Sequence, residues 1–472
     1  MNELAQLDHE YVWHPFTQMK DWLAQEPIVI KSGKGALLWD AQDREYIDAN
    51  SSIWTNLHGH CHPAMNKAIN TQLKKIAHSS ALGLANEPAS ILADRLVKAA
   101  QVNAVGNPPL RKVFFSDNGS TAMEVALKLS YEFSRRTGSP HPRFLSLEGA
   151  YHGDTVGAVS LGHIDLFHKT YDRLLFKTES VMAPYCYRCP FNRAAPERAD
   201  ARTYRKCNWE CTGIVAEKFD QAKSEKRPIT SFIVEASMQG AAGMIPQPDG
   251  WLKTVAQITR DNNAQLIADE IMTGFGRATN PCLESAPIFA TQQEGVTPDF
   301  LALAKGLTGG YLPMAATLTT QPVFDSFLGK YEEFKTFFHG HSYTANQLGS
   351  AAAITSLQLL QSPKSINARA QLYKNISREV APLWSLPQIG DIRQVGLTVG
   401  IELVRNWRTR EPFQLAERAG IRVCEAMARA GVLTRPIGNV IVIMPPYCTT
   451  RKQLKKIFNT LADSIQATLP IT

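Results

Sequence analysis

Between residues 61 and 335 the chain alternates short apolar runs with longer segments, several of which have helical periodicity. Short buried strands separated by helices are typical of a mostly parallel sheet that helices cover on both faces. We therefore predict an α/β fold. The runs are VFFS (113–116), RFLSL (143–147), SFIVEA (231–236), QLIADE (265–270), DFLALA (299–304) and MAATLT (314–319).

The pattern changes on either side of this region. Residues 1–60 combine aromatic and polar clusters with two β-like runs, IVIKSG and GALLWD. Residues 336–472 alternate helical segments with β-like runs and end in a predicted helix near 451–468. We expect a large domain over 61–335, with a helix over 121–136, and a smaller C-terminal domain over 336–472.

Composition restricts the class of protein. The 472 residues carry a formal net charge of +7, and Lys and Arg are dispersed, so a nucleic-acid partner is not expected. No run approaches the roughly 18 apolar residues of a membrane helix, and the start of the chain lacks a signal-peptide pattern. We expect a cytoplasmic, soluble protein without a membrane partner, whose eight cysteines are reduced.

A lysine and an aspartate follow two of the predicted strands. Lys305 directly follows the run DFLALA and precedes Gly306, and Asp269 ends QLIAD. An isolated lysine here would ordinarily be a solvated strand-end residue, whereas a desolvated amine has a lowered pKa and forms Schiff bases readily. The carboxyl ends of parallel strands lie at one edge of a sheet, where ligands bind. A carboxylate such as Asp269 at this edge is suited to pair with the protonated nitrogen of a pyridine ring.

Two further elements fit the same edge. Gly119 and Ser120 stand between a strand and a helix, where backbone N–H groups can hold an anion, although a simple helix cap is the ordinary interpretation. Tyr151 follows the run RFLSL and could stack on a flat ring. Each signal is weak alone. Together, in this order and spacing, they indicate a pyridoxal 5′-phosphate (PLP) enzyme.

Five stretches carry a resemblance to a known family: SDNGSTAMEVALK, YHGDTVGAVS, ADEIMTGFGR, ALAKGLTGG and HGHSYTANQLG. They resemble the class III aminotransferases of PLP fold type I, and the similarity extends over almost the whole chain. This resemblance implies PLP as the cofactor and a small-molecule amino donor and keto acceptor as partners. It also implies a homodimer with active sites at the interface, and a small α+β domain built from residues 1–60 and 336–472.

The same resemblance implies roles for individual residues. Lys305 would hold the cofactor as a Schiff base and move the proton, and Asp269 would pair with the pyridine nitrogen. The other expected cofactor contacts are Tyr151 on the ring, Gly119 and Ser120 on the phosphate, Gln239 near the phenolic oxygen, and His341 with Ser342 on the phosphate of the neighbouring subunit.

Four other stretches are similar to the branch of this family that makes 7,8-diaminononanoate for biotin: WHPFTQMKDW, SSIWTNLHGHCHP, GDIRQVG and LTRPIGNVIVIMPP. The resemblance places Arg435 on a substrate carboxylate, Gly340 and Trp54 at the substrate, and Arg277 at the pocket edge. Phe16 stands where the best-known members have Tyr, and Ile53 where they have Trp. Both S-adenosylmethionine and lysine therefore stay open as the amino donor for 7-keto-8-aminononanoate.

Four cysteines form two close pairs, Cys186-x2-Cys189 and Cys207-x3-Cys211, separated by 17 residues within a stretch near 184–212. Such pairs have the spacing of metal ligands, and we predict either a structural zinc ion or an iron–sulfur cluster. The alternative is four reduced cysteines in a surface insertion.

Three other functions fit parts of the pattern. One is another ω-aminotransferase acting on a diamine or an ω-amino acid, and one is an aminomutase. The third is a non-catalytic, metal-responsive protein on the same scaffold, against which intact Lys305 and Asp269 argue. The stretches WHPFT and RPIG argue against the aminomutase.

Overall fold

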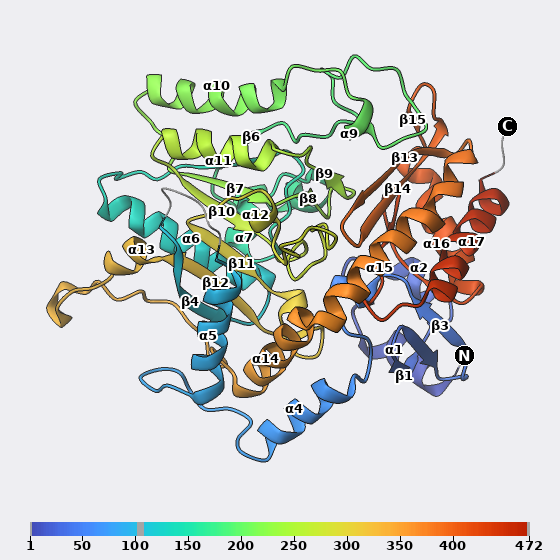
Figure 1. Ribbon diagram of the computed structural model, residues 1–472, viewed down its shortest axis with the longest axis horizontal. Coiled ribbons are helices and arrows are strands. Elements are labelled where there is room, and N and C mark those ends of the chain that lie inside the picture. Colours follow the sequence, from blue (N-terminus) through green and yellow to red (C-terminus); the bar gives the residue numbers. More distant parts are fainter. Residues whose placement is uncertain (1, 102–107, 470–472) are drawn as a thin grey trace.

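A seven-stranded sheet forms the centre of the large domain in the computed structural model, which describes residues 2–101 and 108–469 (Figure 1). Four of its six strand pairs are parallel, and β12 runs antiparallel to both of its neighbours. In spatial order the strands are β4 (Leu110–Ser116), β12 (Ala315–Thr320), β11 (Phe300–Leu303), β10 (Gln265–Asp269), β7 (Ser231–Glu235), β5 (Phe144–Leu147) and β6 (Glu179–Val181).

All six apolar runs of the sequence are strands of this sheet, so the predicted α/β architecture is confirmed. The central strands β7, β10 and β11 are buried along their whole length. Such continuous apolar runs arise because both faces of a parallel sheet are covered. Sequence analysis missed β6, since its three residues Glu-Ser-Val have no apolar run.

Helices cover the two faces of the sheet. On one face α6 (Gly119–Arg136) packs its buried side chains against Ile267, Phe300 and Ala302. On the other face α5 (Glu87–Ala99) and α14 (Gln347–Gln361) pack against Ala268, Leu301 and Leu303. The period-two alternation along β10 and β11 thus directs successive residues to opposite layers. The other helices of this region are α4 (Pro63–Leu73), α7 (Val156–Ser160), α8 (Asp165–His168), α9 (Ala201–Tyr204), α10 (Glu210–Ser224), α11 (Trp251–Asp261), α12 (Ala290–Gln293) and α13 (Gln321–Asp325), with the hairpin β8 (Met238–Gln239) and β9 (Ile245–Pro246).

Strands from both ends of the chain form a second sheet. Strand β16 (Val432–Leu433) pairs in parallel with β3 (Glu45–Asp48), which extends the meander of β1 (Ile30–Lys34) and β2 (Leu37–Asp40). In Figure 1 these blue N-terminal strands lie beside the orange and red C-terminal elements. Those elements are α15 (Pro363–Val380), β13 (Ile389–Val395), β14 (Thr398–Asn406), β15 (Glu411–Pro412), α16 (Ala419–Arg429), β17 (Pro436–Ile437), β18 (Val440–Ile443) and α17 (Arg451–Thr468).

The N-terminal region also contains three short helices: α1 (Glu3–Tyr11), α2 (Met19–Leu23) and α3 (Ser51–Trp54). None of the helices in residues 2–101 and 108–469 is long and apolar enough to cross a membrane. The boundaries of the two domains at residues 60 and 335 stay predictions.

Candidate active site

Lys305 and Asp269 lie at the same edge of the central sheet. Asp269 is the last residue of β10, which pairs in parallel with β11, and Lys305 follows β11 after Ala304. Lys305 opens a 3-10 turn (Lys305–Thr308) with a φ of +40°, an uncommon backbone conformation for a residue with a side chain. Burial lowers the pKa of Lys305, and the nearby Asp269 and Glu235 carboxylates partly oppose this shift. The residue is half-buried, and the role expected of its amine stays a prediction.

Asp269 is buried and held in position by two hydrogen bonds. Its Oδ1 accepts from the backbone N–H of Ile271 at 3.0 Å, and its Oδ2 lies 2.8 Å from His152 Nδ1, which donates to the carboxylate. The His152 side chain is fully buried, and its Nε2 has no partner in the part of the chain that the structure describes. Sequence analysis assigned no role to His152. The signal was available, since this histidine directly follows Tyr151 at a strand end.

The predicted anion-binding element lies at the N-terminus of α6. Asn118 caps the helix by accepting from Thr121 N at 3.1 Å, which leaves Gly119 and Ser120 in the first turn. Ser120 Oγ accepts from Asp154 N at 2.9 Å, so this turn is tied to the segment that carries Tyr151. A Cβ on Gly119 would lie 2.9 Å from Ile271 Cγ2, so any larger residue would require the Ile271 side chain to shift. Free N–H groups and the helix dipole favour a phosphate here.

Tyr151 and Trp54 supply two aromatic rings to this region, and Trp54 lies beside Lys305. The Tyr151 hydroxyl donates to Asp154 Oδ2 at 2.7 Å, and its ring is parallel to that of His168. The Trp54 ring centroid lies 4.6 Å from Lys305 Nζ. Trp54 reaches this place because four consecutive residues, 51–54, have left-handed φ values. Asp48 holds this strained turn by accepting from Ser52 N and Oγ.

The predicted substrate residues have other partners in the structure. Arg435 is exposed, and its Nη2 lies 3.4 Å from the carbonyl oxygen of Phe16, whose ring contacts Tyr151 at 6.5 Å between centroids. Arg277 is fully buried and donates to the carbonyl oxygens of Pro445 and Asn56. Arg277 therefore ties two loops together, and its place at the pocket edge stays a prediction.

The segment before α14 carries Gly340, His341 and Ser342. His341 Nδ1 lies 3.4 Å from Asp117 Oδ2, and the Ser342 carbonyl oxygen accepts from His78 Nε2 at 2.8 Å. Gly340 has a φ of +159°, close to extended backbone. The segment thus lies near the N-terminus of α6 within one chain, and its contact with a neighbouring subunit stays a prediction.

Several buried polar atoms at this edge indicate that the residues fit PLP. Gln239 Nε2 donates to the carbonyl oxygen of Glu148 at 3.0 Å, while its Oε1 is buried without a partner among the described residues. The same holds for His152 Nε2, Trp54 Nε1 and Ser116 Oγ. Buried polar groups are ordinarily satisfied, so a polar ligand at this edge would account for them.

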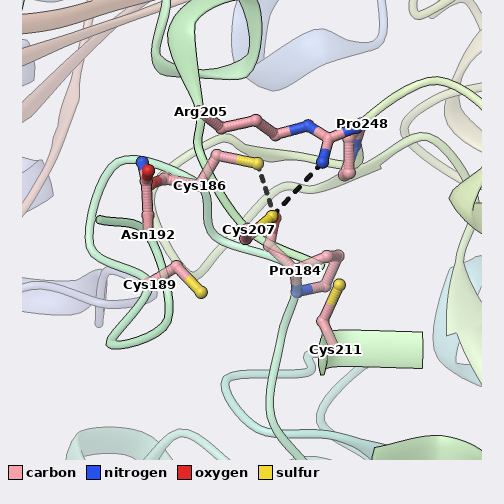
Figure 2. Close-up of a pocket in the computed structure, with 8 residues that line it drawn as sticks. All are labelled: Pro184, Cys186, Cys189, Asn192, Arg205, Cys207, Cys211 and Pro248. Atoms are coloured by element: carbon pink, nitrogen blue, oxygen red, sulfur yellow. Dashed lines mark hydrogen bonds between the residues drawn. The ribbon is translucent and has the colours of Figure 1, made fainter. Parts of the chain in front are cut away.

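The four cysteines line one small cavity with Pro184, Asn192, Arg205 and Pro248 (Figure 2). Within residues 2–101 and 108–469, however, no group of three or more His, Cys, Asp or Glu side chains is placed to hold a metal ion. The predicted zinc or iron–sulfur site at Cys186, Cys189, Cys207 and Cys211 is therefore not supported. In this fold, burial raises the pKa of Cys186 to about 12 and that of Cys211 to about 11.

Comparison with known proteins identifies the family. A family model described as aminotransferase class-III matches residues 19–465. The chain is 44% identical to the adenosylmethionine-8-amino-7-oxononanoate aminotransferase of Geobacter sulfurreducens, over 98% of this chain and 97% of that protein. A protein of the same name from Aquifex aeolicus is 41% identical over 98% and 97% of the two chains.

Solved structures share the fold. The crystal structure of adenosylmethionine-8-amino-7-oxononanoate aminotransferase from Methanocaldococcus jannaschii has a TM-score of 0.88 and 37% identity, covering 98% of both chains. The omega transaminase from Pseudomonas jessenii, in complex with PMP, has a TM-score of 0.88 at 25% identity, covering 99% of this chain and 98% of that chain. These similarities confirm the predicted fold class.

Proposed function

Because this chain belongs to the class III aminotransferases, we propose that it transfers an amino group to 7-keto-8-aminononanoate and forms 7,8-diaminononanoate in biotin biosynthesis. The observation that carries this proposal is the 44% identity to a relative named for 8-amino-7-oxononanoate, over nearly the full length of both chains. The omega transaminase from Pseudomonas jessenii is 25% identical, which favours the first function over a general ω-amine activity.

PLP, when bound, supplies an electron sink for the carbanion that transamination requires. Lys305 Nζ is the group that would hold the cofactor and afterwards move the proton, because its amine is desolvated and its pKa is lowered. Asp269 would face the pyridine nitrogen, and His152 fixes the orientation of that carboxylate. A carboxylate that fixed hydrogen-bond donors hold rigidly keeps its charge directed at the ring.

The other residues would bind and orient. Gly119 and Ser120 would hold the phosphate at the N-terminus of α6, and Tyr151 would cover one face of the ring. Trp54, beside Lys305, would exclude water from the reacting atoms. Arg435 would bind the carboxylate of the keto acceptor, since a planar guanidinium suits a bidentate contact.

The amino donor, the assembly and the compartment are parts of the same proposal. We propose S-adenosylmethionine or lysine as the donor. We propose both donors because of Phe16. It presents an apolar edge near Tyr151, where a tyrosine would offer a hydroxyl to the donor. We also propose a cytoplasmic homodimer whose active sites lie at the subunit interface, with His341 and Ser342 reaching the partner's cofactor phosphate.

The test is direct turnover. The purified holoenzyme is incubated with 7-keto-8-aminononanoate and either S-adenosylmethionine or lysine, and diamine formation is followed by mass spectrometry. We expect product with one of the two donors and none without a donor. Absence of product with every amino donor, from protein that binds PLP, would refute the proposed acceptor. Turnover of simple ω-amines alone would favour the general ω-aminotransferase.

A further inference from the structure

A second carboxylate lies beside Asp269 at the edge of the sheet, and the mechanism above gives it no role. Glu235 is the last residue of β7, which pairs with β10 in parallel, and the register places Glu235 directly opposite Asp269. Register partners on neighbouring strands share a face of the sheet. Both residues are buried, at 6% and 5% exposure. Burying two carboxylates side by side is costly unless each is hydrogen-bonded.

Each oxygen of Glu235 binds a different loop. Oε1 accepts from Tyr151 N at 3.1 Å, and Oε2 accepts from Gly240 N at 2.8 Å. Tyr151 would cover the cofactor ring, and Met238 and Met244 of the hairpin pack in one apolar cluster with Trp54. Glu235 therefore connects the loop after β5 with the β8–β9 hairpin, and the hairpin in turn contacts the aromatic ring next to Lys305.

The charge of Glu235 is coupled to its neighbours. Burial raises the pKa of Glu235 to about 7; His152 lowers it, and Asp269 raises it. Glu235 also acts on the two other titratable groups that face it, since its charge raises the pKa of both Lys305 and Tyr151. An anion near a buried amine favours the protonated amine. Lys305 thus responds to two carboxylates at this edge.

We infer that Glu235 is a positioning residue of the cofactor site, which holds the Tyr151 and Gly240 loops at the sheet edge and helps to set the proton affinity of Lys305. This inference rests on the proposed function only in taking PLP as the ligand. It assigns Glu235 an electrostatic role in addition to its hydrogen bonds, and that role can be separated from structure by experiment.

The experiment measures how fast the apoprotein captures PLP as a function of pH, followed by the visible absorbance of the lysine-bound cofactor. Capture requires unprotonated Lys305, so the midpoint of the pH profile reports its proton affinity. Replacing Glu235→Gln removes a negative charge and keeps nearly the same shape. We expect the midpoint to move downward by about one pH unit, the lower end of the effect of a neighbouring charge.

Glu270→Gln is the matched control. Glu270 directly follows Asp269, is fully buried, and also has a pKa raised to about 7 by burial. Its carboxylate accepts instead from Ala290 N, Thr291 N and Thr291 Oγ1. We expect the capture profile of Glu270→Gln to match the wild type. Equal shifts in both variants, or no shift in Glu235→Gln, would overturn the inference.

A second variant covers a failure of Glu235→Gln to fold. Glu235→Asp keeps the charge but shortens the side chain, so it should leave the midpoint within a few tenths of a unit while PLP dissociates faster. A midpoint in Glu235→Asp that moved by a full unit would contradict the electrostatic role, and unchanged PLP dissociation would contradict the positioning role. No amino donor or acceptor is present in these measurements. A wild type that captures PLP but does not aminate 7-keto-8-aminononanoate would therefore refute the proposed function alone.

Discussion

The contact between Gly153 and Ser120 gives the sharpest structural prediction. Gly153 has a φ of +123°, and a Cβ added there would lie 2.0 Å from Ser120 Oγ, 2.6 Å from Ser120 Cβ and 2.7 Å from Ser120 Cα. Rotating the serine side chain could relieve only the first contact, because Cα and Cβ belong to the start of α6. Gly153→Ala must therefore move the Tyr151 loop away from the turn at Gly119 and Ser120, the proposed phosphate site.

Two contributions determine the size of the effect. An unfavourable backbone conformation costs about 1–3 kcal/mol. The steric overlap with a helix backbone adds about 1–3 kcal/mol. Gly138→Ala separates these contributions, since Gly138 has a φ of +107° and a Cβ there would have no neighbour within 4 Å. We expect a loss of stability of about 2–6 kcal/mol for Gly153→Ala and only about 1–3 kcal/mol for Gly138→Ala.

Two assays check this reasoning. Thermal unfolding followed by circular dichroism compares the stability of the two variants, and titration with PLP measures cofactor affinity. A displaced phosphate-binding turn should raise the Kd for PLP in Gly153→Ala by about tenfold or more, which corresponds to about 1.4 kcal/mol. Gly138→Ala should bind PLP like the wild type. Equal stability losses together with unchanged PLP affinity would show that the overlap with Ser120 does not matter.

Three further predictions concern single residues. Lys305→Ala should abolish the visible absorbance of the lysine-bound cofactor and reduce turnover to background; a retained Schiff-base spectrum with full turnover would disprove the assignment. Arg435→Ala should raise KM for the keto acceptor by about tenfold or more while kcat changes less, because a carboxylate contact is lost in ground and transition state alike; steady-state kinetics with varied acceptor measures this split. Burial raises the pKa of Asp299 from 3.8 to about 6, although its Oδ2 accepts from Leu266 N at 2.8 Å. The folded state therefore holds this proton more tightly than the unfolded state, and the contribution of Asp299 to stability falls as pH rises from about 4 to about 6. Relative to the wild type, Asp299→Asn should gain stability over that interval in unfolding experiments, and a pH-independent difference would contradict the assignment.

The sequence predicted the central sheet well because its signal is local. Each buried strand carries its own apolar run, and α6, predicted over 121–136, begins at Gly119. The same pattern located Lys305 and Asp269, since a polar residue after a buried run must lie at the sheet edge. It would have located Glu235 by the same argument, because Glu235 ends the run SFIVE in parallel with Asp269.

For the cysteine pairs, spacing along the sequence was insufficient to predict a metal site. Cys186-x2-Cys189 and Cys207-x3-Cys211 have the separation of metal ligands along the chain, and the fold does bring all four to one cavity. Metal binding additionally requires that the sulfur atoms converge on one point. That convergence depends on the path of the 17 intervening residues, which sequence spacing does not specify.

By itself, the sequence determined the α/β class, the order of the strands along the chain, and which strand ends carry an amine and a carboxylate. These follow from periodicities of two to four residues. Only the tertiary structure decided that His152 orients Asp269, that Glu235 joins two loops, and that the left-handed turn at 51–54 places Trp54 4.6 Å from Lys305 Nζ. The reason is physical: these contacts join segments far apart in the chain, and hydrogen bonds to Asp48 and to the Met444 carbonyl oxygen help to hold the strained turn.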